Sequence, residues 1–270
     1  MSEQEKAPPG IDPTTPSVAR MYDYYLGGKD NFAADRAAAE QIIELLPSAR
    51  HVARENRAFL GRAVRHLAGL GIDQFIDIGA GLPTRENVHQ VALAWAPRSR
   101  VVYVDNDPIV LVHARALLAD NPQTTVIEGD LRDPKAIMEQ PAVRAAIDFD
   151  RPFAVILCAI VHFIEDDDEA ADIVAHLRGI LPPGGALVLS HGFRGRLEDP
   201  TIAKAEAIYA RTRRGLKIRD RETIQGYFSG LEMVEPGLVH VGSWRPEHAL
   251  TEDESAAGGL GGVGLVPPTG

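Results

Sequence analysis

The stretch Phe75-Ile76-Asp77-Ile78-Gly79-Ala80-Gly81 decides the fold class of this 270-residue chain. Its first four residues are apolar and partly β-branched, apart from Asp77, and are typical of a buried parallel strand. The two glycines then let the backbone turn tightly beneath a ligand. A second apolar run, 101–104, ends on Asp105. Because neighbouring strands of an open α/β sheet end at one edge, we expect Asp105 beside the glycine loop, where it can accept both hydroxyls of a ribose.

Further strand patterns follow along the chain. Thr125-Val126-Ile127 leads into Glu128-Gly129-Asp130-Leu131, so Asp130 is predicted to meet an adenine amino group. Phe153 to Ala159 is a fourth apolar run, and the turn Pro182-Pro183-Gly184-Gly185 precedes a fifth strand, Ala186 to Ser190. Strands that alternate with helix-length segments predict an α/β fold with a doubly wound, mostly parallel sheet.

Details of the loop discriminate between nucleoside ligands. A dinucleotide site uses G-x-G-x-x-G, but the third glycine position here is Thr84, after Pro83. Asp77 would place negative charge near a pyrophosphate, whereas it suits a ligand that carries an ammonium and a sulfonium group, such as S-adenosylmethionine (SAM). The alternative is a plain strand-turn-helix, in which the glycines only permit the turn and Asp77 caps the helix.

The ordered motifs D-I-G-A-G, V-D-N-D-P, E-G-D-L and L-P-P-G-G resemble the class I SAM-dependent methyltransferases, over residues 70 to 193. The flanking segments 19–32, 81–89 and 243–247 resemble a bacterial S-adenosyl methyltransferase subfamily, formerly a domain of unknown function, which extends the resemblance to residues 16 to 248. This resemblance implies a Rossmann-like seven-stranded sheet with one antiparallel strand, completed by Leu231 to Val234 and Leu238 to Val241. It also implies SAM as the cofactor. Pro83 departs from the class, in which a third small loop residue is common.

The cofactor-binding residues expected from the loop, the strand ends and the resemblance lie in four short segments. They are Asp77, Gly79, Ala80, Gly81, Asp105, Asn106, Gly129, Asp130, Leu131 and Ala159.

An aromatic helix is predicted near the N-terminus, because Val18, Met21, Tyr22 and Tyr25 recur at helical spacing. Ser17 can cap its start, and the pair Gly27-Gly28 can end it. The helix either docks on the core or forms a lid over a ligand. The lid or substrate candidates are Tyr22, Tyr25, Lys29 and Asn31.

Helices are also expected at 33–46, 52–70 and 200–214. The last of these leads into a basic cluster, which is either a solvated face or an anchor for an anionic acceptor. The cluster comprises Arg211, Arg213, Arg214, Lys217, Arg219 and Arg221.

Methyl transfer requires mainly that an acceptor be positioned and water excluded. If the acceptor is a hydroxyl, His162 or His191 could take its proton, although histidines at such positions are more often structural. The sequence lacks the Asn or Asp followed by Pro-Pro-Tyr that is common in exocyclic-amine methylation. We expect no metal, because the acidic run 165–169 is more typical of a solvated helix N-terminus.

Composition agrees with a single enzyme domain. The chain has 45% hydrophobic residues, a formal charge of −10 and one cysteine, Cys158, in an apolar run. We therefore expect a cytoplasmic protein with a small-molecule acceptor and no nucleic-acid or membrane partner, whereas the oligomeric state is left open. The expected division is a disordered leader at 1–16, N-terminal helices or a lid at 17–70, a SAM-binding methyltransferase core at 71–248, and a flexible glycine-rich tail at 249–270.

Three functions stay open at this point. The first is a SAM-dependent methyltransferase, and the second is a non-catalytic protein that binds SAM or its demethylated product. The third is an NAD-dependent oxidoreductase, which Asp77 and the missing third glycine disfavour.

Overall fold

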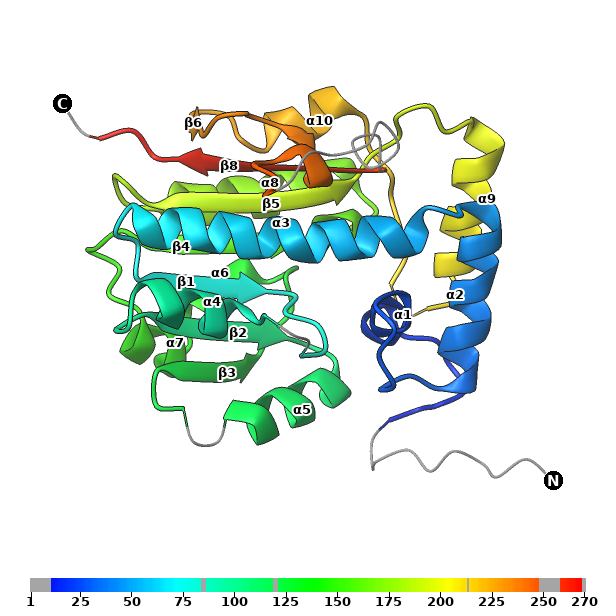
Figure 1. Cartoon of the computed structure of the whole chain (residues 1–270), viewed down its shortest axis with the longest axis horizontal. Coiled ribbons are helices and arrows are strands. Elements are labelled where there is room, and N and C mark those ends of the chain that lie inside the picture. Colours follow the sequence, from blue (N-terminus) through cyan, green and yellow to red (C-terminus); the bar gives the residue numbers. More distant parts are fainter. Residues whose placement is uncertain (1–10, 84–85, 119–120, 213, 248–257, 269–270) are drawn as a thin grey trace.

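The computed structural model describes residues 11–83, 86–118, 121–212, 214–247 and 258–268, and Figure 1 shows their arrangement. In this part of the chain eight strands form one sheet in the order β3-β2-β1-β4-β5-β8-β6, with β7 also paired to β8. The strands are β1 (Gln74–Ile78), β2 (Arg100–Asp105), β3 (Thr124–Glu128), β4 (Ala154–Cys158), β5 (Ala186–Gly192), β6 (Glu232–Met233), β7 (Val239–His240) and β8 (Gly259–Leu265). The mostly parallel α/β sheet predicted from the sequence is confirmed, with eight strands instead of seven.

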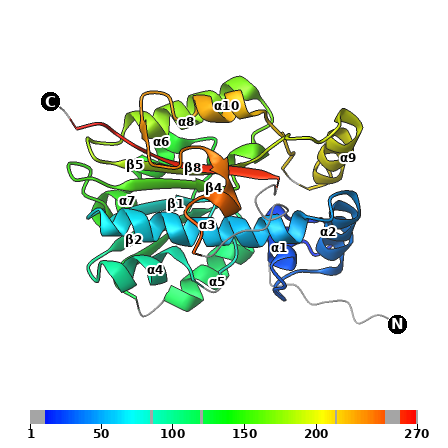
Figure 2. The ribbon, with the colours of Figure 1, turned by 45° about the horizontal axis from the view of Figure 1, so that its top comes forward.

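Helices cover both faces of the sheet, as Figure 2 shows for α8 and α10 on one face and α3 and α4 on the other. The helices are α1 (Val18–Tyr25), α2 (Ala33–Leu45), α3 (Ala49–Gly69), α4 (Val88–Trp95), α5 (Pro108–Leu118), α6 (Pro134–Glu139), α7 (Pro141–Ala146), α8 (Asp167–Gly179), α9 (Asp199–Tyr209) and α10 (Arg221–Gly226), with short 3₁₀ helices η1 (Val161–Phe163) and η2 (Val241–Ser243). No helix in the described ranges is long and apolar enough to cross a bilayer.

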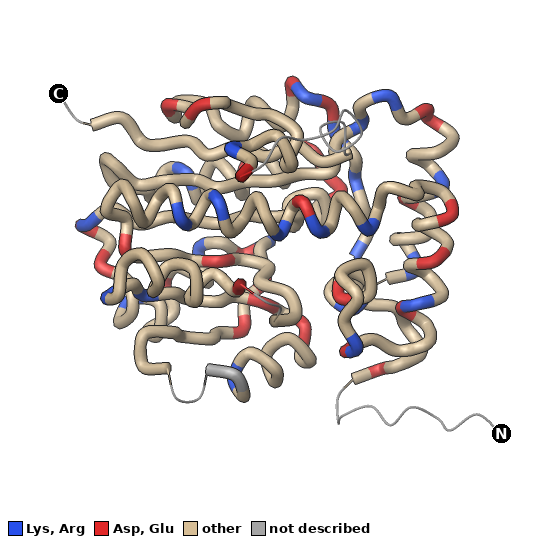
Figure 3. Tube along the Cα trace, viewed as in Figure 1, with Lys and Arg blue, Asp and Glu red and all other residues tan. Residues whose placement is uncertain are grey.

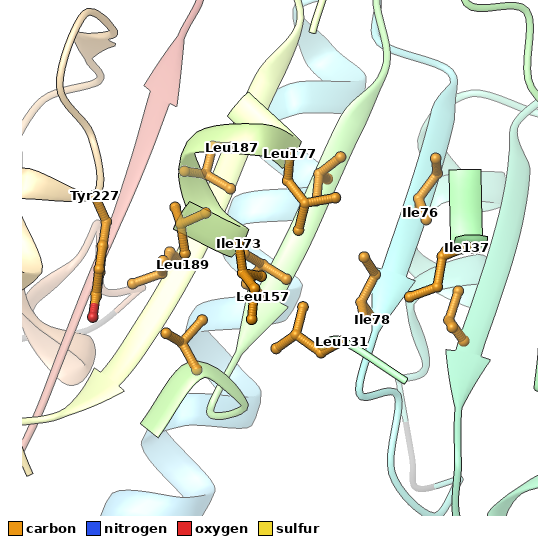
Figure 4. Close-up of a cluster of buried hydrophobic side chains, with 14 of the residues drawn as sticks. Ile76, Ile78, Leu131, Ile137, Leu157, Ile173, Leu177, Leu187, Leu189 and Tyr227 are labelled. Atoms are coloured by element: carbon orange, nitrogen blue, oxygen red, sulfur yellow. The ribbon is translucent and has the colours of Figure 1, made fainter. Parts of the chain in front are cut away.

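The core explains why the apolar runs become strands. Ile76 and Ile78 of β1 and Leu157 of β4 point to one face of the sheet (Figure 4). There Leu157 lies beside Ile173 of α8, and the two isoleucines lie beside Leu131 and Ile137 of the same cluster. The strands are buried on both faces, so their sequences are continuously apolar and do not alternate.

The strand order places a ligand site. It reverses between β1 and β4, because β2 and β3 lie on one side of β1 whereas β4 and β5 lie on the other. In such sheets a crevice opens at the carboxyl ends of the strands where the order reverses. Helices α1, α2 and α9 gather at that edge in both Figure 1 and Figure 2.

The predicted glycine-rich tail is wrong for the residues that the structure describes, because 259–265 form β8. This strand runs antiparallel to β5 on one side and to β6 and β7 on the other. The segments around β6 and β7 complete the sheet without pairing with each other: the two short strands follow one another along the same edge of β8. The rest of the predicted tail, 249–257 and 269–270, lies outside the described residues.

The predicted leader is also corrected in part. Residues 1–10 lie outside the described residues, but Ile11 packs beside Leu82 and Ile109. Arg20 donates from Nη2 to the backbone oxygens of Asp12 and Thr15, at 3.2 and 2.6 Å. These contacts hold residues 11–16 against the domain.

The N-terminal helix begins and ends close to its predicted limits, but its cap differs. The Ser17 side chain makes no cap bond to the helix; its hydroxyl donates to Asp107 Oδ2 at 2.6 Å. The start of α1 is therefore tied to the loop that follows β2.

Candidate functional site

A cavity of about 1750 Å³ opens at the carboxyl ends of the central strands. The loop 79–81 and the ends of β2, β3, β4 and β5 line one part of it. Helices α1, α2, α3 and α9 line another part, together with residues from the segments 11–17, 192–197 and 214–218. The crevice predicted from the strand order is thus a real and large site.

The glycine loop turns through backbone conformations that favour glycine, with φ of 78° at Gly79 and 67° at Gly81. A Cβ on Gly79 would also lie 2.6 Å from Cγ1 of Ile160. The N–H groups of Gly79 and Ala80 donate to the Val104 oxygen at 2.8 and 3.3 Å. These donors are therefore not free for a phosphate.

The third N–H of the loop is used as well, because Gly81 donates to Asp105 Oδ2 at 2.9 Å. Asp105 Oδ1 accepts from the Asp107 backbone at 2.9 Å. Burial raises the pKa of Asp105, and these hydrogen bonds oppose the rise. Each carboxylate oxygen has a further lone pair, so the group can still accept two ribose hydroxyls. Asn106 beside it is exposed and lines the cavity.

Asp77 is only 3% exposed and lines the cavity. Its side chain makes no hydrogen bond within the described part of the chain. Burial raises the pKa of Asp77 to about 7, against the opposing charge of Arg57, and Asp105 adds to the rise. Arginines recur along α3 (Figure 3), and Arg57 is the one among them that lines the cavity. A cationic ligand next to Asp77 would favour its ionised form.

At the end of β3 the structure shows contacts of Asp130 that the sequence did not predict. Gly129 leaves no room for a side chain, because a Cβ would lie 2.7 Å from Cγ1 of Val104. Asp130 accepts from the Arg132 backbone at 3.0 Å and from Arg214 Nη2 at 3.0 Å. Its carboxylate therefore joins β3 to the loop after α9, and Leu131 is buried in the core. Both Asp130 and Leu131 still line the cavity.

The end of β4 is fixed by a hydrogen-bond network that the sequence analysis missed. Ala159 has a positive φ of 54°, and its N–H donates to Ser190 Oγ at 3.0 Å. Ser190 donates to Asn56 Oδ1 at 2.5 Å, and Asn56 Nδ2 donates to the Tyr22 hydroxyl at 3.0 Å. That hydroxyl donates to the Ala53 oxygen at 3.0 Å, and burial raises the pKa of Tyr22 to about 12. The network links β4, β5, α3 and α1 around the cavity.

One signal for this network was present in the sequence. Asn56 follows Ala53 and precedes Leu60 at helical spacing, so it is a polar residue on the apolar stripe of α3. A buried amide in that position needs partners, and the structure supplies them.

His162 is buried, and its Nδ1 accepts from the Gly192 backbone at 3.1 Å. Burial holds its pKa well below the ordinary value, and the charges of His191 and Arg219 act in the same direction. The neutral ring therefore carries its proton on Nε2, which lets His162 donate but leaves no lone pair for a base.

His191 is engaged at both nitrogens. Its Nδ1 donates to the Gly192 oxygen at 2.7 Å, and its Nε2 accepts from Arg219 Nη1 at 3.1 Å. Burial lowers its pKa to about 3. In this geometry neither candidate histidine has a nitrogen available to take a proton from an acceptor.

The four lid or substrate candidates separate into two pairs. Tyr22 and Tyr25 line the cavity. Lys29 is exposed, and Asn31 is buried with its Nδ2 donating to Asp23 Oδ2 at 2.8 Å. Lys29 and Asn31 do not line the cavity. The hydrogen bond from Asn31 to Asp23 closes the turn that follows α1.

The basic cluster is dispersed, and the interpretation as a solvated face is wrong for Arg219, which is 3% exposed. Arg219 pairs with Asp167 at 2.8 Å, and Arg214 pairs with Asp130. Arg211 bonds Gln41 at 2.7 Å, whereas Arg213 lies outside the described residues.

The acidic run 165–169 begins α8, as predicted. Asp166 caps the helix by accepting from the Glu169 backbone at 2.8 Å. Within the described residues, no group of three or more His, Cys, Asp or Glu side chains is placed to hold a metal ion.

The fold and this site define a Rossmann-like protein of the class I methyltransferase type, with a crevice at the point where the strand order reverses. The chain belongs to the S-adenosyl methyltransferase family, whose model matches residues 4–267. The family resemblance seen in the sequence is thereby confirmed.

Solved structures agree with this assignment. A candidate methyltransferase from Thermobifida fusca YX is 42% identical, with a TM-score of 0.90 over 96% of this chain and 98% of that one. A DUF574 family protein from Streptomyces avermitilis MA-4680 is 40% identical, with a TM-score of 0.87 over 94% and 98%. An O-methyltransferase family protein from Burkholderia thailandensis shares the fold at 17% identity, with a TM-score of 0.52 over 84% and 63%. No curated protein matches the sequence.

Proposed function

We propose that this protein binds SAM and transfers its methyl group to a small-molecule acceptor. The observation that carries the proposal is the use of the loop N–H groups. All three, from Gly79 to Gly81, already donate to Val104 or Asp105. A pyrophosphate would need such donors, so the loop suits a nucleoside without phosphates.

The residues present fit SAM. Asp105 offers a lone pair on each oxygen to the ribose hydroxyls, and Asp77 offers a buried carboxylate to the cationic end. Bound SAM supplies a methyl group on a sulfonium: the S–CH₃ bond breaks with its electron pair going to sulfur, while a lone pair of the acceptor forms the new bond to the methyl carbon. When the acceptor atom is a hydroxyl oxygen, its proton leaves to water.

The chain contributes mainly placement. The network from Ala159 through Ser190 and Asn56 fixes the end of β4 against Tyr22. Helix α1 closes one side of the cavity and reduces access of water to the reacting atoms. Because both histidines are engaged as described, neither of them acts as a general base.

The size of the cavity favours an enzyme over a protein that only binds SAM. Small-molecule sites usually enclose about 300–1,000 Å³, whereas this cavity measures about 1750 Å³. The excess leaves room for a second ligand beside the first.

Isothermal titration with S-adenosylhomocysteine (SAH), with NADH in a parallel titration, tests the cofactor. We expect micromolar binding of SAH alone. Transfer of a labelled methyl group from SAM to acceptor candidates then tests catalysis. Binding of NADH but not SAH would overturn the proposal.

A further inference from the structure

The cavity continues past the end of β4 along a row of aromatic side chains, here called the aromatic wall: His162 and Phe163 of η1, Tyr209 of α9 and Tyr25 of α1. The ring centroids of His162 and Phe163 are 4.4 Å apart, and those of Phe163 and Tyr209 are 5.9 Å apart. The hydroxyls of Tyr209 and Tyr25 are 3.1 Å apart. All four residues line the cavity, so elements distant in sequence form one continuous surface.

The first polar atom of this wall is Nε2 of His162. The residue is 9% exposed, and its Nδ1 already accepts from Gly192. The Nε2–H has no hydrogen-bond partner in the described part of the chain. A buried donor of this kind calls for an acceptor atom from a ligand.

The second polar feature is the pair of tyrosine hydroxyls. When two hydroxyls bond to one another, one proton is used and the other is left to donate elsewhere. Neither Tyr25 nor Tyr209 has another polar partner in the described residues. Burial raises the pKa of both phenols, so both keep their protons.

Three charged side chains near the aromatic wall, those of Arg214, Arg219 and Asp23, are bound to other residues of the protein. Arg214 pairs with Asp130, and Arg219 pairs with Asp167. The Asp23 carboxylate packs on the backbone of Gly28, where a Cβ would lie 1.9 Å from its Oδ1, and accepts from Asn31. The wall itself therefore offers rings and neutral donors, without a carboxylate aimed at a bound cation.

We propose that the methyl acceptor is a hydroxylated aromatic molecule without positive charge, whose ring packs on the aromatic wall. Its oxygen accepts from Nε2–H of His162 and from the remaining hydroxyl proton of the Tyr25–Tyr209 pair. This inference rests on the proposed methyltransferase function. A flat ring suits edge and face contacts with Phe163 and Tyr209. A donated hydrogen bond to the acceptor oxygen favours its ionised form, which is the stronger nucleophile. A protonated amine carries only N–H donors, so it could not accept a hydrogen bond from the Nε2–H of His162.

The test uses three probes in the presence of saturating SAH: 2-naphthol, 2-naphthoate and 2-naphthylmethylammonium. Isothermal titration should show 2-naphthol binding the SAH complex at least about tenfold more tightly than the ammonium probe. 2-Naphthoate should bind more weakly than 2-naphthol, because the wall holds no free cation among the described residues to pair with its carboxylate. The double variant Tyr25→Phe/Tyr209→Phe should weaken 2-naphthol binding about three- to tenfold, the usual effect of one neutral hydrogen bond, with SAH binding unchanged.

Tyr24→Phe is the matched control, because the Tyr24 hydroxyl bonds Glu40 and the residue does not line the cavity. Its affinity for 2-naphthol should equal that of the wild type. Tighter binding of the ammonium probe, no effect of the double variant, or no binding of any probe to a protein that binds SAH would overturn this inference alone. Failure to bind SAH would overturn the proposed function itself.

Discussion

The side-chain amide of Asn56 on α3 donates to the hydroxyl of Tyr22 on α1 across 3.0 Å, while its oxygen accepts from Ser190 at 2.5 Å. One buried residue thus joins the N-terminal helix to the strand that supports Ala159. Asn56→Ala should leave the Ser190 hydroxyl without its acceptor and Tyr22 without its donor. We expect the free energy of unfolding to fall by about 1–3 kcal/mol and SAH affinity to fall several-fold, measured by urea denaturation and titration.

Arg54→Ala is the control for this variant, since Arg54 lies on the exposed side of the same helix. It should change stability by less than about 0.5 kcal/mol. A fully stable Asn56→Ala protein would show that the network contributes nothing.

Asp105→Asn tests the ribose contact. A simple loss of Asp105 would disturb the fold as well as the ligand, because its oxygens hold the backbones of Gly81 and Asp107. The amide keeps the shape and one acceptor oxygen, so it removes less of the loop support than alanine would. We expect SAH to bind about tenfold or more weakly, in line with the loss of a charged hydrogen bond worth about 1.5–3 kcal/mol. Unchanged affinity by titration would place the ribose elsewhere.

The buried Asp77 should make stability depend on pH. Its folded pKa is about 7, against an ordinary value of 3.8. The folded protein therefore holds a proton that the unfolded chain has released, and the free energy of unfolding falls as pH rises from about 4 to about 7. The slope is at most about 1.4 kcal/mol per pH unit. Denaturation of wild type and Asp77→Asn at pH 5 and pH 8 should show a smaller difference for the variant; equal differences would mean that Asp77 ionises normally.

Binding of a cationic ligand should reverse this protonation. If SAM places positive charge near Asp77, the carboxyl group ionises on binding and a proton leaves. Titrations at pH 6.5 in buffers with different ionisation enthalpies measure that release. We expect the proton release of the wild type to exceed that of Asp77→Asn, with the same ligand in both. Equal release would remove Asp77 from the cationic end of the site.

Gly264→Ala tests the packing of β8. A Cβ on Gly264 would lie 2.9 Å from Cβ of Leu231 and 3.1 Å from Cδ1 of Phe228. Overpacking of this kind costs about 1–3 kcal/mol. Gly258→Ala is the matched control, because Gly258 is exposed and a Cβ there meets nothing within 4 Å. Equal melting temperatures for the two variants would contradict the close packing of this strand.

The central strands could be predicted because parallel strands buried on both faces are continuous apolar runs. The strand β8 could not, since four of its seven residues are glycine and its sequence is typical of a linker. The reason it is a strand lies in its surroundings: Phe59, Met233 and Leu231 crowd the space that larger side chains would need. No local pattern reports such neighbours.

The residues of the candidate site were likewise predictable from the sequence only in part. The place of Asp105 beside the glycine loop was predictable, although Asp105 and Gly81 are 24 residues apart, because neighbouring strands of an open α/β sheet end at the same edge. The role of His162 depends on the backbone of Gly192, 30 residues away, and that of Asp130 depends on Arg214, 84 residues away. A sequence shows the type of each side chain, but which lone pair is already in use follows only from tertiary contacts.

The place of β8 has a consequence for synthesis of the protein on the ribosome. Its partners β5, β6 and β7 are all made before it, yet the outer edge of β5 pairs with nothing but β8 within the described sheet. That edge stays open until residue 265 has left the exit tunnel. A nascent chain therefore exposes the unpaired edge of β5 until β8 has also been made, which is the stage at which a chaperone would protect that edge from pairing with another chain.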